Sequence, residues 1–156
     1  MLRSCALLLC CSFALLAQKY TGPQPEKSDL PYLVHADNLV ATEAGEAKNE
    51  NRKNEVVAVL DGPTCQAATP LASPIFLIRT DQLTPEALQI FKMESKNGKR
   101  EVVLSRKNKP VARPVMTAVN RVGDNLYKIE VDQQLGNGEY VVTPSGSDRV
   151  FCFRVY

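Results

Sequence analysis

The sequence contains no tryptophan and a single histidine, His35. One imidazole excludes sites that need two or three histidines, which covers most catalytic zinc geometries. The lack of tryptophan argues against a site that stacks sugar rings. The chain also lacks a glycine-flanked serine, an Asp-x-Asp-x-Asp-Gly calcium loop and a phosphate-binding glycine loop. The sequence therefore predicts no catalytic residue, no metal site and no cofactor.

Two alternatives for chemistry involve His35. Asp37 lies two residues further on, and on a strand the two side chains would share a face. Cys65 would be a nucleophile only if the fold placed it against His35. Close packing of His35, Cys65 and a carboxylate in one cleft would favour an enzyme, whereas scattering of these residues would argue against one.

Long apolar runs are also scarce, and one stands at the N-terminus. It extends from Cys5 to Ala17, interrupted only by Ser12, and follows the charged Arg3. This pattern is typical of a secretory signal peptide, and the run is shorter than the roughly 18 to 20 residues that a spanning helix needs. Retention as an anchor, or lipidation at Cys10 or Cys11, stays open. We expect a secreted or periplasmic protein with no membrane span after cleavage of residues 1–17.

Three of the five cysteines fall within this N-terminal segment. The other two, Cys65 and Cys152, either form one disulfide in an oxidising compartment or are independent small residues. A single bridge is no disulfide framework, so the core must supply most of the stability.

The charge balance gives no strong steering toward nucleic acid or anionic lipid. Without Arg3 the chain carries 18 basic and 17 acidic side chains. One stretch is biased, and its basic members are Lys96, Lys99, Arg100, Arg106, Lys107, Lys109 and Arg113. If they gather at one end of the domain, they form a contact patch for an acidic protein partner or an anionic envelope surface. The alternative is a set of solvated hairpin tips and a protected sheet edge. We expect no nucleic-acid partner, because aromatic residues are not interleaved with the basic ones.

The first part of the mature chain is irregular. Residues 18–29 are polar and rich in proline and glycine, which predicts a flexible leader. Residues 30–73 are interpreted as an N-terminal extension with a strand pair and a linker. Within it, residues 43–55 mix both charges without an apolar stripe, so an exposed loop or hairpin tip is expected.

Residues 74–156 read as one all-β domain of about seven strands. Asn97-Gly98 is a strong signal for a tight hairpin. Thr84-Pro85 predicts a single helical turn. Residues 126–132 alternate apolar and polar side chains, as in a half-buried antiparallel strand. The last two strands form a hairpin that turns at residues 144–147.

The segment from Leu135 to Tyr140 resembles the corner before a late strand of immunoglobulin-like domains, where a tyrosine hydroxyl bonds back to the corner backbone. The chain is similar to an uncharacterised exported bacterial family with an immunoglobulin-like antiparallel β-sandwich. The missing tryptophan, and the lack of a second cysteine one strand pair before Cys152, separate it from antibody-type domains. The resemblance implies no activity.

Phe151, Phe153 and Val155 share one face of the last strand, and Cys152 lies on the other. If the phenylalanines fill the core, a bridge from Cys152 to Cys65 runs on the outside and pins the extension to the last strand. Together these patterns predict a non-catalytic binding or structural module. The alternative is an accessory or inhibitor protein of an envelope or secreted enzyme.

Overall fold

The computed structural model describes residues 20–156. The predicted signal segment, residues 1–17, lies outside the described residues. The strands are β1 (Tyr32–His35), β2 (Asn38–Ala41), β3 (Glu43–Glu46), β4 (Lys48–Arg52), β5 (Glu55–Asp61), β6 (Ala68–Thr69), β7 (Ile75–Arg79), β8 (Leu88–Lys96), β9 (Lys99–Arg106), β10 (Lys109–Pro110), β11 (Thr117–Arg121), β12 (Leu126–Val131), β13 (Gly138–Pro144) and β14 (Arg149–Val155). The predicted all-β class with antiparallel sheets is confirmed.

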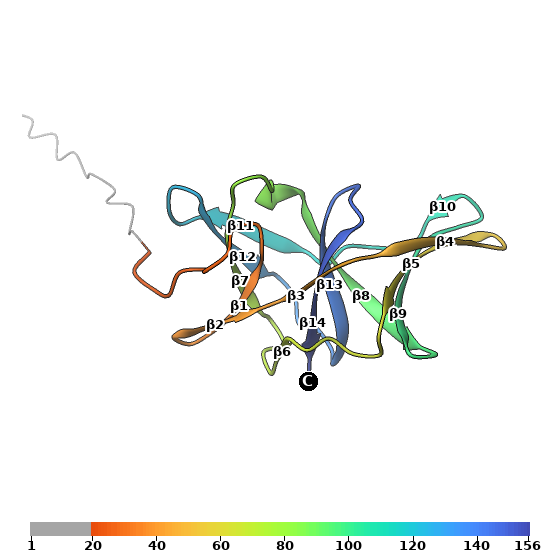
Figure 1. The fold of residues 1–156 in the computed structure, drawn as a ribbon, viewed down its shortest axis with the longest axis horizontal. Helices are drawn as coiled ribbons and strands as arrows, with labels where there is room; N and C mark the ends of the chain where they lie inside the picture. Colours follow the sequence, from red (N-terminus) through yellow and green to blue (C-terminus); the bar gives the residue numbers. More distant parts are fainter. Residues whose placement is uncertain (1–19) are drawn as a thin grey trace, which may run out of the picture.

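A five-stranded sheet forms one side of the molecule, in the order β11-β12-β7-β1-β2 (Figure 1). The β1–β2 hairpin brings residues from the predicted extension into this sheet, where β1 pairs with β7. The end of the predicted flexible leader is attached here as well. Arg79 donates hydrogen bonds to the Ser28 hydroxyl and the Glu26 carbonyl, at 3.1 and 2.8 Å.

The second sheet has nine strands and curls into a half-barrel, which we call the rolled sheet. Its main path runs β3-β14-β13-β8-β9-β5-β4. The two ends of this path, β3 and β4, are separated in the chain by Ala47 alone. Strand β8 serves both halves, because residues 88–93 pair with β13 and residues 94–96 pair with β9. Figure 1 shows the β3–β4 segment crossing the molecule as one long strand.

The first core lies between the two sheets. Phe76 from β7 meets Phe153 from β14 edge-to-face at 5.0 Å, and Tyr140 from β13 stacks on Phe153 at 5.4 Å. All three side chains are buried, as is Phe151. The predicted apolar face of the last strand therefore does fill a core.

The second core lies inside the rolled sheet, on the opposite face of β13 and β14. Strand β14 alternates between the two cores: Phe151 and Phe153 face the first, and Val150 and Cys152 face the second. Both faces of this strand are buried, so it reads as a nearly continuous apolar run. A sandwich of two sheets has one core between them, whereas this domain has two cores.

Several local predictions are confirmed. Asn97 and Gly98 have φ angles of 52° and 75° in the β8–β9 turn, and residues 85–87 form a single 3-10 turn. The seven predicted strands correspond to β7, β8, β9, β11, β12, β13 and β14, and the structure adds the two-residue β10. Tyr140 donates a hydrogen bond from its hydroxyl to the Gly136 carbonyl at 2.7 Å. Burial raises the pKa of this hydroxyl, so it stays a donor.

The prediction of a loop or hairpin tip at residues 43–55 holds only for the exposed turn at residues 53–54 and is wrong for the rest. The segment forms β3, which pairs with β14, and β4, which pairs with β5; β5 pairs in turn with β9. The segment shows no apolar stripe because its inward positions are small or polar. A Cβ atom on Gly45 would lie 3.5 Å from Leu60 and 3.8 Å from Val150, so this residue faces the interior of the rolled sheet.

Among residues 20–156, no helix has the length and apolar character needed to cross a membrane.

Candidate functional site

The interior of the rolled sheet is only partly filled, and it leaves a cavity of about 280 Å³ that we call the rolled-sheet cavity. Its apolar lining comes from Ala47, Ala58, Leu60, Phe91, Met93, Val102, Leu104, Val141 and Val150. Several of these side chains keep an exposed fraction although they point inward, among them Leu60, Phe91 and Leu104. Apolar surface that faces inward and yet meets solvent is the usual signature of a ligand pocket.

Small side chains create this space. Ala47 follows β3, Ala58 lies on β5, and Gly45 faces the interior from the same strand segment as Ala47. A leucine or valine at such positions would close the centre of a half-barrel this narrow. The cavity is thus a direct consequence of the sequence of β3 and β5.

Polar residues gather at one end of the cavity, which we call the mouth. Its exposed members are Asn49 on β4 and Gly146, Ser147 and Asp148 in the β13–β14 turn. The Asn49 side-chain amide donates a hydrogen bond to the Asp148 carboxylate at 2.8 Å, and the Ala47 N–H donates to the Asp148 carbonyl at 2.8 Å. These bonds fasten the turn to the β3–β4 strand beside the opening.

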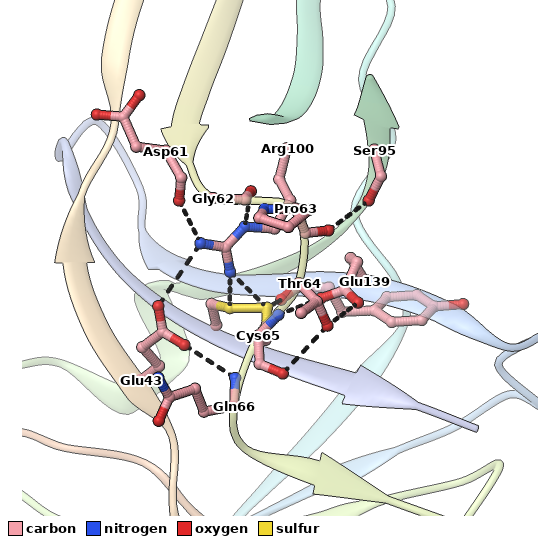
Figure 2. A network of polar contacts seen from close by, with 12 residues as sticks. Glu43, Asp61, Gly62, Pro63, Thr64, Cys65, Gln66, Ser95, Arg100 and Glu139 are labelled. Atoms are coloured by element: carbon pink, nitrogen blue, oxygen red, sulfur yellow. Dashed lines mark hydrogen bonds and ion pairs between the residues drawn. A yellow bond between two sulfur atoms is a disulfide. The ribbon is translucent and has the colours of Figure 1, made fainter. Parts of the chain in front are cut away.

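Arg100 lies at the opposite end, the base, with 2% of its surface exposed. Its Nε donates to the Gly62 carbonyl at 2.9 Å and one terminal nitrogen donates to the Asp61 carbonyl at 2.5 Å. The other terminal nitrogen contacts the sulfurs of Cys152 and Cys65 at 2.6 and 3.0 Å. Figure 2 shows the guanidinium between the loop after β5 and the yellow sulfur–sulfur bond.

The structure joins Cys65 and Cys152 by a disulfide that spans 87 residues of sequence. Both cysteines are buried, with exposed fractions of 1% and 0%, inside the second core. The expectation that such a bridge would run on the outside is therefore wrong, because β14 has a core on each face. The bridge does tie the segment after β5 to the last strand.

Two carboxylates hold the same loop. Glu139 accepts hydrogen bonds from the Cys65 N–H at 2.7 Å and the Thr64 hydroxyl at 2.9 Å (Figure 2). Glu43 accepts from the Gln66 N–H at 2.9 Å and lies 3.5 Å from the Arg100 guanidinium. The base of the cavity is therefore a polar network in which hydrogen bonds fix the loop and Arg100 pairs with Glu43.

Cys65, Glu139 and Cys152 bring three donor atoms within 4.8 Å of one another. This group does not fit a metal ion. Its sulfurs are bonded to each other, whereas metal binding requires thiolates. The cationic Arg100 also contacts both sulfurs and would oppose a second positive charge.

An ion-pair network lies on the outer face of the rolled sheet. Arg52 binds Glu101 at 2.7 Å and Glu50 at 2.8 Å. The hydrogen bond from Arg52 lowers the pKa of the Glu101 carboxyl below its ordinary value. Val57 and Val59 of β5 are buried on this face, beside the aliphatic stems of these pairs. Strand β5 thus forms a firm wall, with the cavity on one side and the ion pairs on the other.

The basic residues predicted as a patch do not gather at one end. Lys96 and Lys99 flank the β8–β9 turn, whereas Arg106, Lys107 and Lys109 surround the β9–β10 turn at the other end of β9 (Figure 1). Arg113 is exposed beyond β10, and Arg100 is buried at the base of the cavity. Arg106 pairs with Glu55 at 2.7 Å and Lys99 with Glu50 at 3.7 Å. The predicted gathering is wrong because the two turns terminate opposite ends of one strand.

His35 and Cys65 belong to different parts of the fold. His35 ends β1 in the five-stranded sheet, and Cys65 lies in the second core with its sulfur bonded to Cys152. The structure therefore does not provide Cys65 as a free nucleophile. Sequence reasoning missed the rolled-sheet cavity, because Gly45, Ala47 and Ala58 carry too little apolar surface to mark a strand face.

Comparisons with protein-family models, with curated proteins and with solved structures found no match to this chain.

Proposed function

We propose that the chain is a non-catalytic binding module of an exported protein, and that the rolled-sheet cavity holds a small apolar molecule. The observation that carries this proposal is the contrast between the two cores. The first core is closed by aromatic and branched side chains, whereas the second leaves about 280 Å³ open. An unfilled apolar interior costs stability, which favours a role for the space.

The size of the cavity supports a small ligand. An engineered apolar cavity of about 150 Å³ is large enough to bind benzene. The rolled-sheet cavity has about 280 Å³, close to the lower end of natural ligand pockets. At the cavity volume per ligand atom that benzene occupies, the space holds a molecule of roughly ten non-hydrogen atoms.

The frame around the cavity supports binding with little reorganisation. The disulfide, the Arg100 network and the ion pairs around Arg52 hold the base and one wall. At the mouth, by contrast, an exposed turn is fastened to the β3–β4 segment by the hydrogen bonds of Asn49 and Ala47 to Asp148. A preformed site reduces the ordering cost of binding.

Export of the protein stays part of the proposal. The N-terminal run from Cys5 to Ala17 has the pattern of a secretory signal. A buried disulfide between Cys65 and Cys152 supports an oxidising compartment.

An immunoglobulin-like origin of residues 74–156 also remains a proposal. The Tyr140 corner and the antiparallel strands of this segment support it. In that interpretation residues 30–73 are an addition that rolls one sheet and creates the cavity.

The test is a titration of the full chain, expressed with export into an oxidising compartment, with toluene. Methyl NMR signals of Leu60, Met93 and Val150 report on the cavity, and we expect them to shift in a saturable manner. Ala47→Leu fills the space and should remove the shifts. The matched control Ala44→Leu lies on the exposed face of the same segment and should leave them unchanged. Unsaturable shifts, or shifts that survive Ala47→Leu, would exclude the cavity as the binding site.

A further inference from the structure

The charges around the rolled-sheet cavity limit the chemistry of its ligand. Among the lining residues of 20–156, Arg100 and Asp148 are the charged ones, one at the base and one at the mouth. A buried arginine at the end of an apolar cavity suggests at first a site for a carboxylate, such as the end of a fatty acid. The contacts of Arg100 argue for the opposite.

Each nitrogen of the Arg100 guanidinium already has a partner. Nε donates to the Gly62 carbonyl, and one terminal nitrogen donates to the Asp61 carbonyl. The other terminal nitrogen contacts the two sulfurs of the disulfide. The loop carbonyls would be left unsatisfied if the guanidinium turned toward a ligand, which is costly for buried groups. Arg100 is therefore a structural cation with no donor reserved for a ligand.

The base also carries more negative than positive charge. Glu43 lies 3.5 Å from the Arg100 guanidinium, and the buried Glu139 lies on the other side of the disulfide. The base thus holds two carboxylates and one guanidinium, and only Glu43 is paired with it. A ligand carboxylate that reached the base would be desolvated without a free donor, beside a network whose net charge is already negative.

Asp148 places a negative charge at the mouth of the cavity. One of its carboxylate oxygens accepts the Asn49 hydrogen bond, which fixes the negative charge beside the opening. A ligand that inserts its tail and leaves an anionic head at the mouth would place two negative charges close together.

We infer that the ligand of the rolled-sheet cavity is an uncharged apolar molecule of roughly ten non-hydrogen atoms, of the type of a medium-chain alcohol or ester tail, and that the site discriminates against carboxylates. This inference rests on the proposed function, because it concerns the occupant of the same cavity. It separates the protein from binders of ionised fatty acids.

The experiment compares 1-octanol with octanoate at pH 7, by calorimetric titration of the full chain. We expect 1-octanol to bind at least tenfold more tightly. Along a series of n-alcohols, affinity should rise about fourfold per methylene and stop rising once the cavity is filled, near eight to ten carbons. Continued rise with chain length would indicate a surface or an aggregate instead of an enclosed site and would overturn the inference.

Two variants test whether the charge of Asp148 weakens the binding of octanoate. Asp148→Asn keeps an oxygen acceptor for Asn49 but removes the charge, so octanoate should gain about threefold while 1-octanol is unchanged. Asp124→Asn, an exposed acid in the turn before β12, is the matched control and should alter neither ligand.

The outcomes also separate this inference from the proposed function. Equal binding of octanoate and 1-octanol, lost for both in Ala47→Leu, would overturn the charge inference and leave the cavity as the site. Absence of binding for every ligand, or binding that Ala47→Leu does not reduce, would overturn both.

Discussion

Arg100 is the side chain on which the base of the cavity depends. Its guanidinium is planar, and its nitrogens reach two carbonyls and two sulfurs in different directions. A lysine ammonium is a compact point charge that reaches fewer of these acceptors. Arginine at this place acts as a connector between the loop after β5, the last strand and β9.

Arg100→Lys should therefore lower the free energy of unfolding by about 2–4 kcal/mol, because buried acceptors lose their donors. Arg106→Lys on the same strand is the matched control. Arg106 is exposed and makes one surface ion pair, so this change should cost less than about 0.5 kcal/mol. Urea unfolding measures both, and equal stability of the two variants would contradict the connector role.

The Tyr140 hydroxyl makes a second side-chain contact that a single substitution can test. It donates to the Gly136 carbonyl at 2.7 Å. Tyr140→Phe should lower the free energy of unfolding by about 1 kcal/mol and lower the melting temperature without affecting secretion. Tyr156→Phe, at the exposed C-terminal residue, should have no effect. An unchanged melting temperature for Tyr140→Phe would refute the corner as a stabilising contact.

Asp29 links stability to pH. Burial alone would raise the pKa of its carboxyl, but the N–H groups of Leu83, Gln82 and Asp81 and the charge of Arg149 outweigh it and lower the pKa. Because the pKa of Asp29 is lower in the folded state, the carboxylate stabilises the fold at pH values above its pKa in the unfolded state, near 4. This stabilisation is lost as the pH falls through the pKa of the folded state.

Asp29→Asn should lower the free energy of unfolding by about 1–2 kcal/mol at pH 7. Asparagine tolerates the positive φ of 56° at this position, so the change isolates the charge. The difference from the parent protein should shrink as the pH falls below 4, in melting curves recorded across that range. A difference that stays constant with pH would show that the charge has no part in it.

At the scale of elements, the β3–β4 segment and β8 decide the architecture. The β3–β4 segment pairs with β14 through β3 and with β5 through β4, and β8 pairs with both β13 and β9. The rolled sheet therefore bends at the β3–β4 segment and at β8. The loop from Asp61 to Gln66 then crosses one end and is held by Arg100, Glu43 and Glu139. The disulfide fixes this loop to β14.

Removal of the bridge should destabilise the protein by about 4–5 kcal/mol in the chain-entropy model, because the bridge spans 87 residues. The double variant Cys65→Ala/Cys152→Ala tests this by urea unfolding, since neither cysteine is then left as a buried thiol beside Arg100. A midpoint close to that of the parent protein would mean that the loop contacts hold the base without the bridge.

Across the whole molecule, local turns and strand patterns can be predicted from the sequence, whereas the pairing of distant strands cannot. The Asn97-Gly98 turn, the Tyr140 corner and the alternation of residues 126–132 were predictable, because each depends on near neighbours in sequence. The pairing of β3 with β14, and of β5 with β9, joins distant segments and has no local marker.

The candidate site cannot be predicted from the sequence for the same reason. Arginine is normally a surface residue, so the sequence predicts Arg100 as part of the basic patch, although it is buried. Gly45, Ala47 and Ala58 carry too little apolar surface to mark a strand face, yet their size creates the cavity. A cavity is space left by residues from several strands, and only the assembled sheet shows it.

The rolled sheet leaves open space beside Ala47. Thermal melting of Ala47→Leu without any ligand measures whether that space exists, with Ala44→Leu as the control. Filling an existing cavity should stabilise the protein by about 0.5–2 kcal/mol and raise the melting temperature by about 2–6 °C. Ala44→Leu should leave the melting temperature unchanged. A lower melting temperature for Ala47→Leu, as expected for an overpacked core, would show that the rolled sheet has no such space.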